Sequence, residues 1–248
     1  MKMLNVVIPM AGLGIRFANQ GFNLPKPLID VNGEPMIAKA IKTLNLDSAY
    51  SLTQYYFVIA KNDFTQKVKE VIRKVEPTAR FIEIDYLTEG PAVTALLYKE
   101  NINNDNELVI ANCDQIMEWN SQTFLVNARL YDGCVVTYHT DTEKNSYAKL
   151  DEFGFVTQIK EKEVISDASL NGIHYWKHGK YFVQSAEEMI ANQDRAPNGE
   201  FYIGPTYNYM IKHGHKVGIY HKPCSQHHAV GVPSDLERYL NYENSKNK

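Results

Sequence analysis

Apolar runs alternate with amphipathic segments from residue 3 to residue 111, and this alternation restricts the folds open to the chain. Residues 3–9 and 54–60 read as strands covered on both faces, and residues 35–44 between them have helical spacing. Residues 63–75 and 92–99 read as helices, and residues 81–86 and 108–111 as strands. This order predicts an α/β fold with a doubly wound, mostly parallel sheet that binds ligands at the carboxyl ends of its strands.

The second half of the chain is less regular. Strands are expected at residues 134–139, 172–176 and 216–221, with a hairpin formed by residues 147–150 and 156–160. Helices are expected at residues 181–191, at residues 206–212 and from about residue 233. No repeat or linker divides the 248 residues, so we expect a single domain with an α+β portion laid across the α/β core.

Composition excludes several partners. The 26 Lys and Arg residues against 29 Asp and Glu residues give a net charge of −3, which favours neither nucleic acid nor an anionic membrane. No stretch approaches the roughly 20 apolar residues that cross a bilayer. The cysteines, Cys113, Cys134 and Cys224, are odd in number and lack metal-ligand spacing, which predicts free thiols and a cytoplasmic protein. The sequence leaves open whether the chain forms a homo-oligomer.

A glycine-containing loop follows the first predicted strand. Gly12 and Gly14 would let backbone N–H groups approach a phosphate closely, although a simple tight turn explains them as well. A dinucleotide-binding fingerprint requires a third glycine where Phe17 stands and an acidic residue where Lys61 and Asn62 stand. The Gly-Lys-Ser/Thr of a P-loop is also absent.

Two charged side chains extend this candidate phosphate site. Lys26 lies between two prolines that stiffen the backbone, so its ammonium is either a fixed phosphate ligand or a surface charge. Together with the loop and Arg16, it brings positive or donor groups to the mouth of the first strand. Asp114 follows a buried strand, where a carboxylate can hold Mg²⁺ beside phosphates or cap the following turn.

Four short segments occur in the following order along the chain: Gly12-Leu13-Gly14-Ile15-Arg16, Pro25-Lys26-Pro27-Leu28, Glu89-Gly90-Pro91-Ala92 and Asn112-Cys113-Asp114. Together they resemble nucleotidyltransferases that make nucleotide-activated sugars and related phospho-compounds, particularly the short bacterial capsule-synthesis branch that includes cytidylyltransferases. The resemblance implies a Rossmann-like fold in which Arg16, Lys26 and Asp114 are catalytic and Asp114 binds Mg²⁺ or Mn²⁺. The implied nucleotide-binding residues are Met10, Ala11, Gly12, Leu13, Gly14, Glu89, Gly90, Pro91 and Asn112.

The same resemblance extends to the second half. Glu161 and Lys162 resemble an acceptor-binding Glu-Lys pair, Gly172 a glycine of the acceptor wall, and Glu200 an acidic residue facing the acceptor. It implies that residues 1–118 mainly bind nucleotide, that residues 119–225 mainly bind acceptor, and that residues 226–248 return to the core.

The chain departs from the family at one position. Members of the family usually carry a second metal-binding Asp where Ala229 stands here. Asp235 is a poor replacement because it belongs to the first turn of the last helix. The site therefore relies on Asp114 and phosphate oxygens alone, gains a ligand from His227 or His228, or favours a softer ion such as Mn²⁺.

The sequence thus predicts a nucleotidyltransferase that transfers NMP from an NTP, with CTP favoured, to a phosphorylated small molecule and releases pyrophosphate. The resemblance implies a role in capsule or surface polysaccharide biosynthesis, with phosphoglutamine or a sugar phosphate as acceptor. The alternatives are a UTP- or dTTP-dependent sugar-1-phosphate nucleotidyltransferase, a GT-A-like glycosyltransferase and a catalytically silent nucleotide-binding regulator. Glycosyltransferases usually show Asp-x-Asp where this chain has Asn112-Cys113-Asp114.

Overall fold

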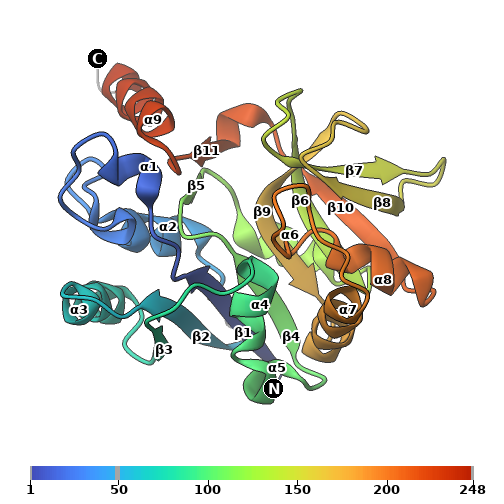
Figure 1. Ribbon diagram of the computed structural model, residues 1–248. Coiled ribbons are helices and arrows are strands. Elements are labelled where there is room, and N and C mark those ends of the chain that lie inside the picture. Colours follow the sequence, from blue (N-terminus) through green and yellow to red (C-terminus); the bar gives the residue numbers. More distant parts are fainter. Residues whose placement is uncertain (1, 48–50, 247–248) are drawn as a thin grey trace.

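A computed structural model describes residues 2–47 and 51–246. In this part of the chain, the main sheet has the strand order β10-β6-β9-β4-β1-β2-β3, and the hairpin β7-β8 joins it through β9 (Figure 1). Along this order of seven strands, all neighbours are parallel except β9, which runs antiparallel to β4 and β6, so the α/β fold with a mostly parallel sheet is confirmed. The strands are β1 (Lys2–Met10), β2 (Ser51–Ala60), β3 (Arg80–Ile84), β4 (Glu107–Ala111), β6 (Gly133–His139), β7 (Ser146–Leu150), β8 (Val156–Glu161), β9 (Ala168–Trp176) and β10 (Val217–His221).

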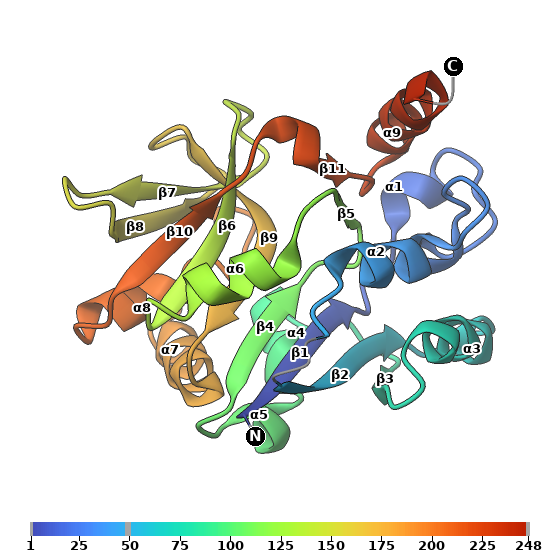
Figure 2. The same ribbon diagram turned by 180° about the vertical axis from the view of Figure 1, so that it is seen from behind.

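Helices cover both faces of the sheet (Figures 1 and 2). Alternate side chains of β1 enter different cores: Leu4 and Ile8 pack with one set of helices, and Val7 packs with the other. The first set is α2 (Met36–Leu44), α3 (Thr65–Val75) and α6 (Ser121–Ala128), and the second is α4 (Pro91–Leu96), α5 (Lys99–Ile102), α7 (Gly179–Ala191) and α8 (Thr206–Lys212). Within the described residues, no helix has the length and apolar character required to span a membrane.

Strand β1 is the topological switch point of the sheet: β2 and β3 lie on one side of it, and β4 lies on the other. In open α/β sheets, ligands bind in the crevice at such a switch point, outside the carboxyl ends of the strands. Because β1 and β4 are parallel neighbours, the segments that follow Met10 and Ala111 emerge at the same edge of the sheet. This places the glycine-containing loop beside the segment that contains Asp114.

Several short elements were not predicted. The expected helix at residues 92–99 divides into α4 and α5, and α6 was missed because its apolar pattern is weak, with Val126 exposed among buried neighbours. Two three-residue strands, β5 (Gln115–Met117) and β11 (His227–Ala229), form a separate antiparallel ladder. After β11, α9 (Pro233–Lys246) packs through Leu236 and Tyr239 against residues from the first 36 positions of the chain.

A buried ion pair ties α6 to the sheet. The carboxylate of Glu107, which has no exposed surface, accepts two hydrogen bonds of 2.8 Å from Arg129 and one of 2.7 Å from Tyr175. We expect Arg129→Ala to lower the free energy of unfolding in urea by about 3 kcal/mol, the lower end for breaking a buried pair because the guanidinium is partly exposed. Arg238→Ala removes an exposed pair with Asp235 and should cost less than about 1 kcal/mol. Equal losses in the two variants would contradict this account.

Candidate active site

The loop after β1 forms one wall of a cavity of about 460 Å³, here called the first cavity. Arg16 comes from the short helix α1 (Ile15–Ala18), and Lys26 comes from the 3-10 turn η1 (Lys26–Leu28). Both therefore reach the mouth of β1 from separate short elements. The first cavity is lined by Pro9, Met10, Gly12, Leu13, Gly14, Ile15, Arg16, Phe17, Lys26, Pro27, Leu87, Cys113, Glu200 and Gly231.

Lys26 and Asp114 form an ion pair at the edge of this cavity. The Nζ atom of Lys26 lies 2.5 Å from Oδ2 of Asp114, and both side chains are about four-fifths buried. Burial opposes the ionisation of Asp114, but the adjacent Lys26 ammonium and its hydrogen bond outweigh that effect and lower the pKa of the carboxyl. The pair therefore combines a carboxylate and an ammonium, the two charges that a metal–phosphate complex can engage.

The C-terminal segment closes over Asp114. Strand β11 pairs with β5 so that Ala229 lies opposite Gln115, and the N–H of Val230 donates to the backbone oxygen of Asp114 at 2.9 Å. A Cβ atom on Gly231 would lie 2.4 Å from Oδ2 of Asp114, so only glycine allows this close approach. Ala229 thus lies near Asp114 without supplying a carboxylate.

We expect Gly231→Ala to reduce turnover strongly while leaving the protein folded. The added methyl group would displace the Asp114 carboxylate and disturb its contact with Lys26, because 2.4 Å is far below a normal carbon–oxygen contact. The effect is measured as release of pyrophosphate, the product that the sequence resemblance implies, and circular dichroism with a thermal melt serves as the control for folding. Turnover at the wild-type level in a folded variant would show that the position of this carboxylate is not critical.

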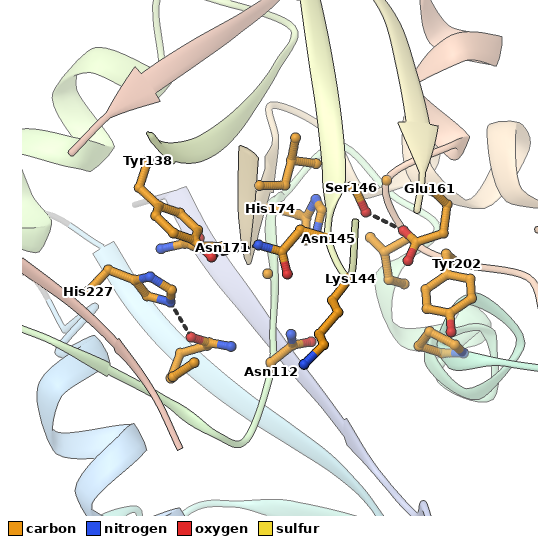
Figure 3. A pocket seen from close by; sticks show the side chains of 17 residues that line it. Asn112, Tyr138, Lys144, Asn145, Ser146, Glu161, Asn171, His174, Tyr202 and His227 are labelled. Atoms are coloured by element: carbon orange, nitrogen blue, oxygen red, sulfur yellow. Dashed lines mark hydrogen bonds between the residues drawn. The ribbon is translucent and has the colours of Figure 1, made fainter. Parts of the chain in front are cut away.

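A second cavity of about 230 Å³ has Asn112 and Gln115 in its wall. Figure 3 shows this cavity, with Asn112 labelled. Glu161 is almost fully buried in its wall and accepts a hydrogen bond from the Ser146 hydroxyl; burial raises the pKa of the Glu161 carboxyl. Gly172 has φ 89°, and a Cβ there would lie 2.2 Å from Nδ2 of Asn112. The second cavity is lined by Pro91, Asn112, Gln115, Tyr138, Lys144, Asn145, Ser146, Glu161, Leu170, Asn171, Gly172, His174, Tyr202, Ile203, Gly204, His227 and Ala229.

The remaining candidate residues differ in their relation to the two cavities: some line a cavity, and others belong to neither lining. Lys162 donates a hydrogen bond of 2.8 Å to the hydroxyl of Tyr202. Tyr202 lines the second cavity, so Lys162 lies behind that part of the wall. Ala11 is buried behind the loop, and Glu89 lies at the surface in an ion pair with Arg195. Pro91 and Asn112, which were expected at the nucleotide, line the second cavity. Glu200, which was expected at the acceptor, lines the first cavity. Gly90 packs against the backbone of Phe201.

Sequence reasoning missed most polar side chains of the second cavity. Most of the missed residues lie on β6, β7 and β9 and the segments that adjoin them, while Gln115 lies on β5 and Tyr202 precedes α8. An isolated Asn, Ser or Tyr in such segments carries no motif. His174 is an example: it is buried in β9 and stacks near Trp176 and Tyr207, as a core residue would. The signals that the sequence did carry for this cavity were Glu161 and Gly172, from the family resemblance, and His227, as an alternative metal ligand.

Known proteins resemble both the sequence and the fold. The nucleotidyl transferase family matches residues 5–238, which is nearly the whole chain. The chain therefore belongs to the nucleotidyl transferase family.

Individual relatives are more distant. The bifunctional protein GlmU of Methanocaldococcus jannaschii is 23% identical over 236 residues, which cover 94% of this chain and 52% of that protein, so the chain spans about half its length. The nucleoside-diphosphate-sugar pyrophosphorylase from Vibrio cholerae RC9 has a TM-score of 0.84 at 22% identity, with 95% of this chain and 99% of that chain covered. The inositol-1-phosphate CTP transferase from T. maritima has a TM-score of 0.73 at 11% identity, with 97% and 96% covered. At these identities, the structural similarities establish the fold.

Proposed function

We propose that this protein transfers NMP from an NTP to a phosphorylated small molecule and releases pyrophosphate. One observation carries the proposal: the Lys26–Asp114 ion pair lies at the boundary of two cavities, with Lys26 lining the first and Gln115, the neighbour of Asp114, lining the second. A nucleotide in the first cavity and an acceptor in the second would meet at this pair. We also propose that residues 1–118 mainly bind nucleotide and that residues 119–225 mainly bind acceptor, although Glu200 lines the first cavity and Asn112 the second.

The chemistry requires an acceptor phosphate oxygen to attack the α-phosphorus in line. A bond forms between that oxygen and the α-phosphorus, and the bond to the α,β-bridging oxygen breaks, so pyrophosphate leaves with the electron pair. Such a reaction depends mainly on positioning and charge stabilisation. The backbone of Gly12–Gly14 would bind phosphates, while Arg16 and Lys26 would neutralise charge that develops in the transition state.

The donor atoms at Asp114 fit a divalent cation. Mg²⁺ is commonly held by one or two carboxylates and completes its shell with phosphate oxygens and water. Asp114 supplies one such carboxylate beside the first cavity, and the described residues contain no group of three or more His, Cys, Asp or Glu side chains arranged for a metal. When bound, Mg²⁺ or Mn²⁺ would neutralise phosphate charge, and Lys26 would exchange its contact with Asp114 for phosphate oxygens.

CTP is the nucleotide we favour, with phosphoglutamine or a sugar phosphate as acceptor. The choice is supported by the resemblance to the short capsule-synthesis branch, and a structure named as a CTP transferase shares the fold. The same resemblance supports a role in capsule or surface polysaccharide biosynthesis. The three unpaired cysteines, Cys113, Cys134 and Cys224, support a cytoplasmic location.

A substrate matrix tests this proposal. Each of the NTPs CTP, UTP, dTTP, ATP and GTP is combined with choline phosphate, phosphoglutamine and several sugar phosphates, with Mg²⁺ or Mn²⁺, and pyrophosphate is measured. We expect pyrophosphate only where NTP, acceptor and metal are all present, with CTP giving the highest rate. Preference for UTP or dTTP with a sugar 1-phosphate would replace the CTP assignment while retaining the reaction. Nucleotide binding without pyrophosphate release in any combination would contradict the proposed activity.

A further inference from the structure

Hydrogen bonds hold the carboxylate of Asp114 from both sides. Lys26 contacts Oδ2, and the side-chain nitrogen of Gln115 donates to Oδ1 at 3.3 Å. The side-chain oxygen of Gln115 is in turn hydrogen-bonded to Nε2 of His227 (Figure 3). The side chains of His227, Gln115 and Asp114 therefore form one hydrogen-bonded chain that begins at the wall of the second cavity.

The direction of each hydrogen bond in this chain is fixed by chemistry. An ionised carboxylate only accepts, so the amide of Gln115 turns its NH₂ group toward Asp114 and its oxygen toward His227. An amide oxygen cannot donate, so the hydrogen in the second bond belongs to Nε2 of His227. Burial lowers the pKa of His227 to about 4, so its ring is neutral at ordinary pH and carries a single N–H.

His227 is itself held in place. Its ring lies 4.4 Å from the ring of Tyr138, measured between centroids, and only 8% of the residue is exposed. The hydroxyl of Tyr138 accepts a hydrogen bond of 2.6 Å from Asn145, which also lines the second cavity. The N–H group of His227 is therefore held in one direction. Its hydrogen bond to the side-chain oxygen of Gln115 fixes the orientation of that amide.

We propose that His227 and Gln115 are positioning residues that fix the orientation in which Asp114 receives the metal–nucleotide complex. The inference rests on the proposed function, because it requires Asp114 to be a metal ligand. Without His227, the oxygen of Gln115 loses its partner, and rotation of the amide would bring that oxygen against the carboxylate. Residues that orient a metal ligand contribute about 10–100-fold to metal affinity or activity.

His228 offers a matched control on the same strand. Successive side chains of a strand point to opposite sides, and Nε2 of His228 lies 3.2 Å from the carboxylate of Glu118, away from Asp114. His228→Ala therefore removes an imidazole from β11 without touching the chain from His227 to Asp114. His227→Gln is the conservative variant, because its amide nitrogen can replace the Nε2 donor.

The experiment measures Mn²⁺ binding by water-proton relaxation in the presence of the NTP that the wild-type protein uses best, with the acceptor omitted. We expect His227→Ala and Gln115→Leu each to weaken Mn²⁺ binding about 10–100-fold. The double variant should be no weaker than the weaker single variant, because both substitutions break one connected chain. His227→Gln should stay within about threefold of the wild-type affinity and His228→Ala should match it, since each leaves the donor to Gln115 in place.

Wild-type Mn²⁺ affinity in folded His227→Ala, or additive losses in the double variant, would overturn the inference. Asp114→Asn separates this failure from that of the proposed function. If Asp114→Asn loses Mn²⁺ binding and His227→Ala does not, only the positioning role fails; if Asp114→Asn keeps it, both proposals fail. Should His227→Ala not fold, Gln115→Leu at its half-buried position decides the outcome.

Discussion

Replacement of Lys26 by alanine is expected to lower kcat by about 10²–10³, the usual cost of removing one preorganised donor that stabilises transition-state charge. The ammonium of Lys26 lines the first cavity and is fixed by its contact with Asp114 and by the flanking prolines. Its loss would leave the charge on the reacting phosphate less well neutralised. Pyrophosphate release at saturating NTP and acceptor measures the effect.

Lys69→Ala is the matched control for this substitution. Lys69 lies on α3 and forms an ion pair of 2.6 Å with Glu83, but it lines neither the first nor the second cavity. We expect this variant to retain wild-type turnover, because it loses only a structural ion pair. Near-normal turnover in Lys26→Ala would remove the main support for phosphate chemistry at this position.

Asp114→Asn is expected to lower kcat by at least about 100-fold. It should also abolish the dependence of turnover on Mg²⁺ concentration that the wild-type protein shows. The substitution keeps the shape of the side chain but removes the charge that would hold the cation, and a bound metal ion supplies several kcal/mol of charge stabilisation. Turnover is measured across a titration of Mg²⁺ and, separately, of Mn²⁺.

Asp235→Asn provides the comparison for this second variant. Asp235 is a carboxylate of the C-terminal segment, but it belongs to the first turn of α9 and pairs with Arg238. Its replacement should leave the metal dependence unchanged. An unaltered metal requirement in Asp114→Asn, or a lost one in Asp235→Asn, would contradict the assignment of the metal to Asp114.

The first half of the chain was predictable because its signals are local. Long apolar strands and the helices between them specify a parallel sheet, and a parallel sheet brings the ends of its strands to one edge. The loop at Gly12 and the carboxylate of Asp114 each follow such a strand, so their proximity follows from topology. The proline-flanked Lys26 added a charge whose place the backbone restricts.

The second cavity could not be predicted in the same way. Its walls come from antiparallel strands whose pairing depends on distant partners, such as β9 between β4 and β6. Strands of three residues, such as β5 and β11, are too short to show a period. The sequence therefore gave no sign that His227 and Gln115 would meet, or that Glu200 would line the first cavity.

The most direct test of the central claim follows the α-phosphate itself. The wild-type protein is incubated with CTP labelled with ³²P at the α position, a phosphorylated acceptor from the substrate matrix and Mg²⁺, and the products are separated. We predict that the label moves to the acceptor and that one pyrophosphate forms for each labelled product. If the label remains in CTP with every acceptor tested and the other NTPs behave alike, or if it appears only as free CMP, the protein is not the proposed nucleotidyltransferase.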